Sequence, residues 1–268
     1  MKNIIKEDLT PIGVQENGEI FGLFQKDRSG ILHLFGRPGQ GMTITLEEIL
    51  ISDIHNNRGG MIIDPYGDLI KNVQEYVPKD KVNNVSIFEA QNETLDENIA
   101  RFNKEIDFEE IKNNNAKMLL CKLDSRILGV DLAREIGISL VNQFLQIIDG
   151  KQRSLVIDEA HNFLNEEIVK QIINSKEKEL SCILTAQTSR HYRTDLLERL
   201  LNAANHVLCY YTDEETANLI NKYHPEINTD EIKSLEKYNF IVKVNAQTDS
   251  PATMKLKGIF PIPYSKNL

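Results

Sequence analysis

The stretch LHLFGRPGQGMTITLEEILISD, residues 32–53, decides the fold, because it reads as an apolar strand, a glycine-rich turn and then a helix. The turn fits the pattern G-x-x-x-x-G-K-[ST] at Gly36, Gly41 and Thr43, with Met42 where the pattern has lysine. The backbone N–H groups of such a turn and the N-terminus of the following helix attract anions. The turn therefore predicts a phosphate site without its usual cation, the alternative being an ordinary strand–helix turn.

A nucleotide held by this turn would be surrounded by the residues of the loop. Thr43 would place its hydroxyl on Mg²⁺, and the side chain at position 42 would normally contact the terminal phosphates. The predicted nucleotide-binding residues of the loop are Gly36, Arg37, Pro38, Gly39, Gln40, Gly41, Met42, Thr43 and Ile44. ATP and Mg²⁺ are the cofactors that such a loop predicts.

Two further strands end in polar side chains that suit phosphate chemistry. RSLVIDEAHNFL, residues 153–164, is an apolar strand that ends in Asp158 and Glu159. Asp158 could hold Mg²⁺ through water, and Glu159 could polarise the water that attacks a γ-phosphate. The alternative is a surface acidic pair that caps the next helix. ILTAQTS, residues 183–189, ends in Gln187, which could sense the γ-phosphate.

Short apolar runs alternate with helical patterns along the chain, which predicts an α/β fold with a mostly parallel sheet and helices on both faces. Strands are expected at 31–35, 60–64, 84–88, 117–123, 153–158, 180–186 and 206–211. Helices are expected at 43–56, 67–77, 130–149, 164–175, 193–203, 213–223 and 229–236. Residues 238–262 predict a C-terminal antiparallel hairpin at the sheet edge.

The remaining segments complete the expected organisation as a single domain over residues 1–268. Residues 1–30 are expected to form a lead-in hairpin. Residues 91–116 are rich in Asn and Glu, which predicts a polar insertion, either a surface helix pair or a partly mobile segment.

Composition limits the class of protein. The chain has 268 residues, 41% of them hydrophobic, and resembles an ordinary globular protein. No apolar run is long enough for a membrane span and the first residues do not form a signal peptide, so a cytoplasmic location is expected. Cys121, Cys182 and Cys209 stand singly in apolar runs, which predicts buried, reduced thiols. The net charge of −9 argues against a surface that coats DNA generally, although a local basic strip could line a pore.

The order of these segments, and the sequence between them, resembles the FtsK–HerA class of P-loop ATPases, above all the TraG-like coupling and type IV secretion ATPases. KDRSGILHLFGRPGQG, residues 26–41, is similar to the class's entry into the P-loop. IDPYGDL, residues 63–69, is similar to the class signature IDPHGDL, with tyrosine in place of histidine. This stretch is the most specific part of the resemblance. KMLLCKLDSRILGVDLAREIGISLVNQFL, residues 117–145, is similar to the segment before the Walker B strand. The resemblance covers residues 20–260.

This resemblance implies a RecA-like P-loop NTPase domain and an ATP hydrolase. It implies a ring of identical subunits, most often a hexamer, that moves DNA or a DNA–protein conjugate, as in conjugative transfer, type IV secretion or HerA-type DNA processing. It also implies a membrane-bound or nuclease partner from another chain, and a cytoplasmic position that can be peripheral to a membrane complex. Asp64, which follows an apolar strand, would lie beside the nucleotide, and Asp68 could cap the next helix. For Asp64, an ordinary turn residue is the alternative.

The resemblance also directs attention to basic residues that a neighbouring subunit could contribute. Lys176 stands near a position where relatives place an arginine, and lysine lacks the two-pronged guanidinium group. The candidates for a contact with a neighbour's nucleotide or with DNA are Lys176, Lys178, Arg190, Arg193 and Arg199. Ordinary surface charge is the alternative for any one of them.

Met42 leaves three explanations open. The lysine was replaced, by design or recently, in an active ATPase; the protein is a natural pseudo-ATPase; or the loop is no phosphate site. Losing a charge-assisted phosphate contact costs on the order of 2–4 kcal/mol of transition-state stabilisation. Because Thr43, Asp158, Glu159 and Gln187 are all present, we favour the first explanation. The predicted catalytic positions are Glu159, Gln187 and Met42, with hydrolysis impaired by Met42.

Overall fold

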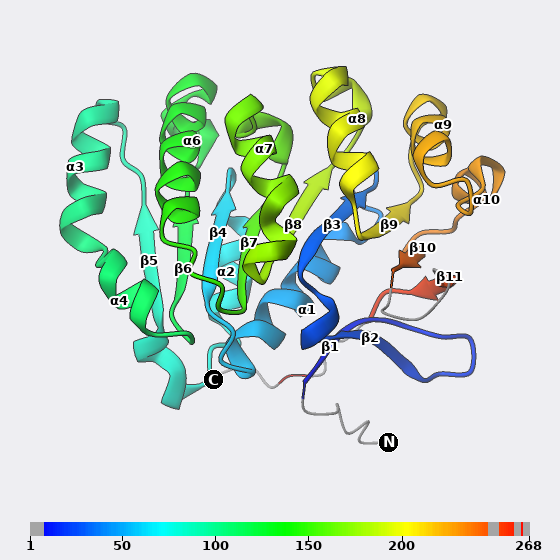
Figure 1. The fold of residues 1–268 in the computed structure, drawn as a ribbon, viewed down its shortest axis with the longest axis horizontal. Helices are drawn as coiled ribbons and strands as arrows, with labels where there is room; N and C mark the ends of the chain where they lie inside the picture. Colours follow the sequence, from blue (N-terminus) through cyan, green and yellow to red (C-terminus); the bar gives the residue numbers. More distant parts are fainter. Residues whose placement is uncertain (1–7, 246–251, 260–263, 265–268) are drawn as a thin grey trace.

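A computed structural model of the chain describes residues 8–245, 252–259 and 264. Within these residues, eleven strands form one sheet in the order β2-β1-β11-β10-β9-β3-β8-β7-β4-β6-β5 (Figure 1). The strands are β1 (Leu9–Val14), β2 (Ile20–Phe24), β3 (Gly30–Phe35), β4 (Gly60–Asp64), β5 (Val85–Glu89), β6 (Met118–Lys122), β7 (Arg153–Ile157), β8 (Leu180–Ala186), β9 (His206–Tyr210), β10 (Asn239–Val244) and β11 (Ala252–Lys257). The seven strands predicted from the sequence correspond to β3 to β9.

The strands from β9 to β5 are parallel to their neighbours, so their carboxyl ends meet at one edge of the sheet. Leu34 in β3 lies opposite Leu208 in β9 and Thr185 in β8. Every residue of β3 is buried, as is every residue of β8. Strands buried on both faces read as continuous apolar runs, which is why the sequence predicts them well.

Helices cover both faces of the parallel strands (Figure 1). The helices are α1 (Met42–His55), α2 (Asp68–Gln74), α3 (Leu95–Glu105), α4 (Phe108–Asn113), α5 (Ser125–Leu128), α6 (Val130–Gln146), α7 (Glu166–Ile173), α8 (Thr194–Ala203), α9 (Glu214–Tyr223) and α10 (Thr229–Lys233). Ile31 and Phe35 pack into one core with α6, α7 and α8. Leu32 and Leu34 point the other way, into a second core with α1 and α2. The predicted α/β fold is confirmed.

The sheet is antiparallel at its other end. β10 pairs with both β9 and β11, which confirms the two C-terminal strands, while the turn predicted between them lies outside the described residues. β11 contacts β1 at Lys257 and Val14, and β1 pairs with β2, so β2 is the edge strand. Because β10 is antiparallel to β9, it begins at the edge where β3 and β9 end.

A buried ion pair joins three elements at the opposite edge of the sheet. Arg28, just before β3, pairs with Asp53 in α1, and both side chains are almost completely buried. The Arg28 guanidinium also donates to Asp53 Oδ2 at 3.0 Å and to Thr10 Oγ1 at 2.8 Å. Ser154 in β7 donates to the same carboxylate at 2.7 Å. These bonds satisfy the carboxylate inside the protein.

Three smaller observations concern predictions from composition. The polar segment 91–116 contains α3 and α4, with Phe102 and Ile111 buried beneath them. Cys121, Cys182 and Cys209 are buried and free, as expected. Among the described residues, no helix combines the length and the apolar character that crossing a membrane requires.

Candidate functional site

The glycine-rich loop lies at the carboxyl edge of the parallel strands, between β3 and α1. The Gly36 N–H donates to the Ala186 carbonyl at 3.1 Å, which fixes the start of the loop to the end of β8. A Cβ on Gly36 would lie 2.7 Å from Tyr210 Cβ, so only glycine fits. Gly41 has φ of 115° and immediately precedes α1, which begins at Met42. The loop therefore opens a helix of 14 residues whose N-terminus faces the site.

A cavity of about 370 Å³ lies on this loop. Its lining residues are Arg37, Pro38, Gly39, Gly41, Met42, Thr43, Ile44, Tyr66, Asp158, Glu159, Gln187, Lys237 and Tyr238. The structure thus brings the loop, the two carboxylates after β7 and Gln187 after β8 into one pocket, as the sequence predicts. Gly36 and Gln40 are part of the loop backbone without lining the pocket.

Thr185 in β8 positions both carboxylates. Its hydroxyl donates to Asp158 Oδ1 at 2.6 Å and accepts the Glu159 backbone N–H at 2.9 Å. The Gln187 side-chain amide donates to Glu159 Oε1, which holds the second carboxylate toward the end of β8. Glu159 itself has φ of 48°, a left-handed backbone conformation that is uncommon outside glycine. The pair is therefore oriented by the neighbouring strand.

Both carboxylates are harder to ionise than usual. Burial raises the pKa of Asp158 to about 6, against the opposing hydrogen bond from Thr185. Burial and the nearby Asp158 raise the pKa of Glu159 to about 7. Two carboxylates held together in a partly dry pocket repel each other when both are charged, so the site favours a cation. Such raised values are typical of groups that accept a proton in catalysis.

The donor set fits Mg²⁺. The Thr43 hydroxyl and the Asp158 carboxylate line the same pocket, and oxygen ligands of this kind are those that Mg²⁺ takes in nucleotide sites. Glu159 also belongs to a group of potential metal ligands with His161 and His191, whose ligand atoms lie within 4.8 Å of one another. Here His161 Nδ1 is 3.5 Å from Glu159 Oε2. Burial lowers the pKa of His161 to about 4, so its ring is neutral near pH 7.

Asp64, expected beside the nucleotide, is the last residue of β4 and stands before the turn that leads into α2. Its carboxylate is buried and accepts the backbone N–H groups of Tyr66, Gly67 and Ile70 at 2.8–3.0 Å. It therefore caps α2 and does not line the pocket. Asp68, predicted to cap this helix, is the first residue of α2, and its exposed side chain pairs with Arg126. An aspartate at a strand end can accept the free N–H groups of the turn that follows it. Asp68 comes after this turn in the sequence, so its side chain does not accept them.

The predicted basic residues do not form one group. Lys176 and Lys178 lie in the 3₁₀ helix η4 (Asn174–Lys178), before the first residue of β8. Arg190 lies in η5 (Ser189–His191), after the last residue of that strand. A strand of seven residues separates the two sets by roughly 20 Å.

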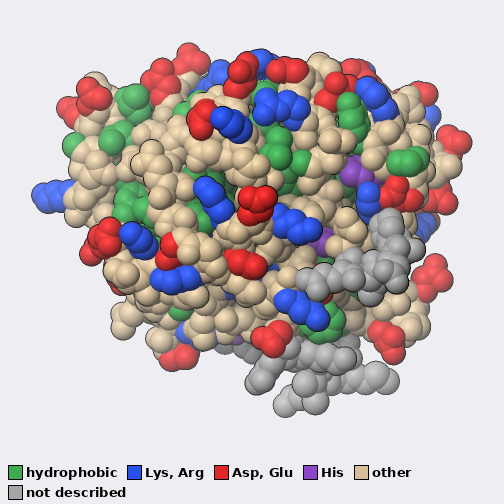
Figure 2. Space-filling view, viewed as in Figure 1, with side chains coloured by type: hydrophobic (Ala, Val, Ile, Leu, Met, Phe, Trp, Pro, Cys, Tyr) green, Lys and Arg blue, Asp and Glu red, His purple; other side chains and the backbone are tan. Residues whose placement is uncertain are grey.

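The arginines at the pocket edge are paired with acidic side chains. Arg190 pairs with Glu215 at 2.7 Å, and Arg193 pairs with Glu166 and Asp195 at 2.9 Å. Arg199 is exposed within α8. Figure 2 shows the same mixture more widely, with basic and acidic side chains interspersed on the face covered by α6, α7 and α8.

Three lining residues were not predicted. Tyr66 occupies the position where the IDPHGDL signature has histidine, so the resemblance carried a signal for it. Lys237 and Tyr238 precede β10, and no local pattern marks them. The Tyr238 backbone N–H donates to the Gln40 carbonyl at 2.9 Å, which attaches this segment to the glycine-rich loop.

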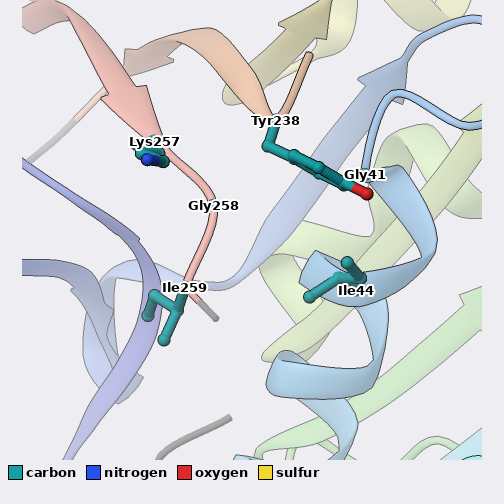
Figure 3. A pocket seen from close by; sticks show the side chains of 6 residues that line it. All are labelled: Gly41, Ile44, Tyr238, Lys257, Gly258 and Ile259. Atoms are coloured by element: carbon teal, nitrogen blue, oxygen red, sulfur yellow. The ribbon is translucent and has the colours of Figure 1, made fainter. Parts of the chain in front are cut away.

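A second, more apolar pocket of about 260 Å³ adjoins the first (Figure 3). It is lined by Gly41, Ile44, Tyr238, Lys257, Gly258 and Ile259. The Tyr238 ring extends from the start of β10 toward Gly41, and Ile44 and Ile259 lie below it (Figure 3). The two pockets share Gly41, Ile44 and Tyr238, so one elongated ligand could occupy both.

Comparisons with known proteins give matches in structure alone. The sequence matches no protein-family model and no curated protein. VirB4 of Thermoanaerobacter pseudethanolicus is 11% identical, with 97% of this chain and 99% of that chain covered at a TM-score of 0.68. The plasmid coupling protein TrwB, solved with the non-hydrolysable GTP analogue GDPNP, is 10% identical, with 96% and 90% covered at a TM-score of 0.67.

The genome packaging NTPase B204 of Sulfolobus turreted icosahedral virus 2, solved with AMPPCP, is 15% identical. That match covers 87% of this chain and 99% of the other at a TM-score of 0.54. The chain shares the fold of these proteins over most of its length. The resemblance predicted from the sequence is confirmed at the level of the fold.

Proposed function

We propose that this chain is a P-loop ATPase of the FtsK–HerA type that couples ATP binding and hydrolysis to the movement of DNA or a DNA–protein conjugate. One observation carries the proposal: the glycine-rich loop, Thr43, the Asp158–Glu159 pair and Gln187 line a single pocket at the N-terminus of α1. The chain shares its fold with a coupling protein, VirB4 and a genome packaging NTPase. This shared fold supports the movement of DNA or a DNA–protein conjugate over other functions of P-loop proteins.

The phosphates of ATP would lie on the glycine-rich loop, where backbone N–H groups and the N-terminus of α1 favour negative charge. Thr43 and Asp158 would hold Mg²⁺, which neutralises charge on the phosphate oxygens. The adjoining apolar pocket suits the base and the sugar, with the Tyr238 ring as a flat surface.

Glu159 would orient the attacking water and accept its proton. Its pKa of about 7 makes the carboxylate a competent acceptor near neutral pH, and the Gln187 amide holds it in place. Gln187 lies at the end of β8 beside the phosphate end of the pocket, so it can report the presence of the γ-phosphate to that strand. Met42 gives the phosphates no positive charge from the usual position, so hydrolysis is slower than with lysine there.

Assembly and partners follow from the same proposal. A ring of identical subunits, most often six, would let a neighbour complete each nucleotide site and would enclose DNA in a central channel. A membrane-bound or nuclease partner from another chain would supply the cargo, with this chain in the cytoplasm or at the periphery of a membrane complex. The alternative function is a pseudo-ATPase that binds ATP and gates an interaction without turnover, which Met42 favours.

Titration of the unmodified chain with a fluorescent ATP analogue and Mg²⁺ tests the site itself. We expect saturable binding in the micromolar to submillimolar range, because the backbone supplies much of the phosphate cradle. Absence of saturable binding at millimolar nucleotide would overturn the proposal. Steady-state hydrolysis by the Met42→Lys form, with and without DNA, then separates the motor from the pseudo-ATPase, since only the motor turns over and does so faster with DNA.

A further inference from the structure

The segment before β10 brings a lysine to the phosphate pocket from a distant part of the sequence. Lys237 lines the pocket together with Met42, Asp158 and Glu159. Its position follows from the topology, because β10 is antiparallel to β9 and so begins at the edge where the glycine-rich loop begins. The bond from Tyr238 N–H to the Gln40 carbonyl, 2.9 Å long, fixes this segment to the loop.

Tyr238 fixes the direction of this segment. It has φ of 69°, which reverses the chain just before β10. Its ring packs so closely over the loop that a Cβ on Gly41 would lie 2.9 Å from Tyr238 Cδ1, and Figure 3 shows the ring directed at Gly41. Lys237 Nζ lies 4.8 Å from the centre of the same ring. The ammonium is therefore held near the loop by a ring that itself contacts the loop.

The charges that line the pocket show why this lysine matters. Asp158 and Glu159 are acidic, and the cationic lining residues are Arg37 and Lys237. The Arg37 guanidinium stacks 5.2 Å from the Tyr211 ring, beyond the end of β9. Among the described residues, no carboxylate forms an ion pair with Lys237, whereas Lys233 pairs with Glu214 and Lys243, in β10, pairs with Glu226.

We propose that Lys237 supplies the positive charge to the terminal phosphates that Met42 cannot supply. This inference rests on the proposed nucleotide site. A lysine has a flexible four-carbon stem and acts on phosphate as a point charge, so it can approach from the hairpin as well as from the helix. A methionine at position 42 brings no charge to the start of α1, so the positive charge of the site depends on the docking of the β10 hairpin on the loop.

A thermodynamic cycle between positions 42 and 237 tests this inference. Affinity for a fluorescent ATP analogue with Mg²⁺ is measured for the unmodified chain, Lys237→Met, Met42→Lys and the double variant. We expect Lys237→Met to weaken binding about tenfold or more, the loss typical of one charge-assisted hydrogen bond. In the Met42→Lys background the same change should weaken binding less than about threefold, because the helix lysine already contacts the phosphates.

Three control variants accompany the cycle. Lys255→Met removes an exposed lysine from the same hairpin outside the pocket and should leave affinity unchanged. Lys237→Arg keeps the charge and should retain most of the affinity. Arg37→Met removes the other cation of the pocket. Far-ultraviolet circular dichroism and a thermal melt of each variant verify that it is folded.

The outcomes separate this inference from the proposed function. If the unmodified chain binds nucleotide and Lys237→Met binds it equally well, the inference is wrong and the nucleotide site stands. Equal losses in both backgrounds would also overturn it, because they would show a role independent of position 42. If Arg37→Met alone abolishes binding, the charge belongs to Arg37. If no variant binds, Met42→Lys included, the proposed function itself is wrong.

Discussion

The Thr185 hydroxyl donates a hydrogen bond of 2.6 Å to Asp158 Oδ1, across the boundary between β8 and β7. The same oxygen accepts the Glu159 N–H, so one side chain sets the position of two adjacent carboxylates. Thr185 is completely buried, and its partners lie at the pocket surface. The orientation of the acidic pair is therefore a property of the neighbouring strand.

We predict that Thr185→Val impairs hydrolysis more than nucleotide binding. Valine has nearly the same shape but neither donates to Asp158 nor accepts from Glu159. Groups that orient ligands or bases in this way are worth about 10- to 100-fold in activity. The measurement is ATP turnover and nucleotide affinity on the Met42→Lys background. Thr185→Ser keeps the hydroxyl and is the matched control, and equal turnover by the valine and serine forms would contradict the prediction.

Glu159→Gln, also on the Met42→Lys background, should keep nucleotide binding and lose hydrolysis. The amide matches the carboxylate in size but is a poor acceptor for the proton of the attacking water. The rate of ATP hydrolysis, followed with radiolabelled ATP or a coupled enzyme assay, measures the effect. We expect this rate to fall about 100-fold or more. Turnover within threefold of the Met42→Lys parent would show that another group is the base.

The parts of the site that were predicted share one physical feature. The glycine-rich loop, Asp158 and Gln187 each follow an apolar run that forms a parallel strand. The carboxyl ends of such strands meet at one edge, so recognising the three strands places the three motifs at the same edge of the sheet. The pairing of β8 with both β3 and β7 then brings them into one pocket. The roles assigned to these residues stay predictions until activity is measured.

The parts that were not predicted depend on pairing between distant strands. Lys237 reaches the pocket because β10 pairs antiparallel with β9, and hairpin residues carry no local pattern that reveals which edge they face. Lys176 shows the converse, since nearness to Gln187 in sequence becomes separation once β8 lies between them. Its role toward a neighbouring subunit stays a prediction. Asp64 had two plausible roles at a strand end, and only the geometry of the turn shows that it caps α2.

The buried pair of Arg28 and Asp53 should contribute strongly to stability. Arg28→Met removes the guanidinium and leaves the Asp53 carboxylate buried, with Ser154 as its one remaining side-chain donor in the part of the chain that the structure describes. Breaking such a pair from one side costs about 3–5 kcal/mol. Urea unfolding followed by circular dichroism measures the loss. The double change Arg28→Met with Asp53→Leu removes both charges and should recover part of it; a double variant no more stable than Arg28→Met would contradict this explanation.

Glu48 should make the protein less stable as the pH rises. It lies in α1, almost completely buried, and neither carboxylate oxygen has a hydrogen-bond partner among the described residues. Burial raises its pKa from 4.5 to about 8. Between these values the folded state holds a proton that the unfolded state has released, so the free energy of unfolding falls as the pH rises from 4.5 to 8.

The variant Glu48→Gln removes this titration. We expect it to be more stable than the unmodified chain at pH 8 by on the order of 2 kcal/mol, with little difference near pH 4.5. Thermal melts at a series of pH values measure the difference. Glu109→Gln, the same change at an exposed glutamate, is the matched control. A constant offset between Glu48→Gln and the unmodified chain at all pH values would contradict the prediction.

The last prediction concerns assembly and uses the separation of the basic residues. Arg190 and Arg193 lie at the edge of the sheet that holds the pocket, while Lys176 and Lys178 lie at the other end of β8. The ion pairs of both arginines are exposed, so exchanging them for a contact with a neighbour's phosphate costs little. If a bound nucleotide bridges two subunits, the arginines and not the lysines are placed to complete the neighbour's site.

We therefore expect Mg·ATP to convert the unmodified chain to closed oligomers, hexamers above all, as measured by multi-angle light scattering at several protein concentrations. The double change Arg190→Ala with Arg193→Ala should weaken this assembly without changing the thermal melt of the monomer. The double change Lys176→Ala with Lys178→Ala removes the same charge from the opposite edge and should assemble normally. Loss of assembly in the lysine variant alone would place the subunit contact at the edge of the sheet opposite the pocket. A nucleotide shared between two subunits could not then form that contact. A monomer under all conditions would remove the ring, and with it the main reason to regard this ATPase as a motor that encloses DNA.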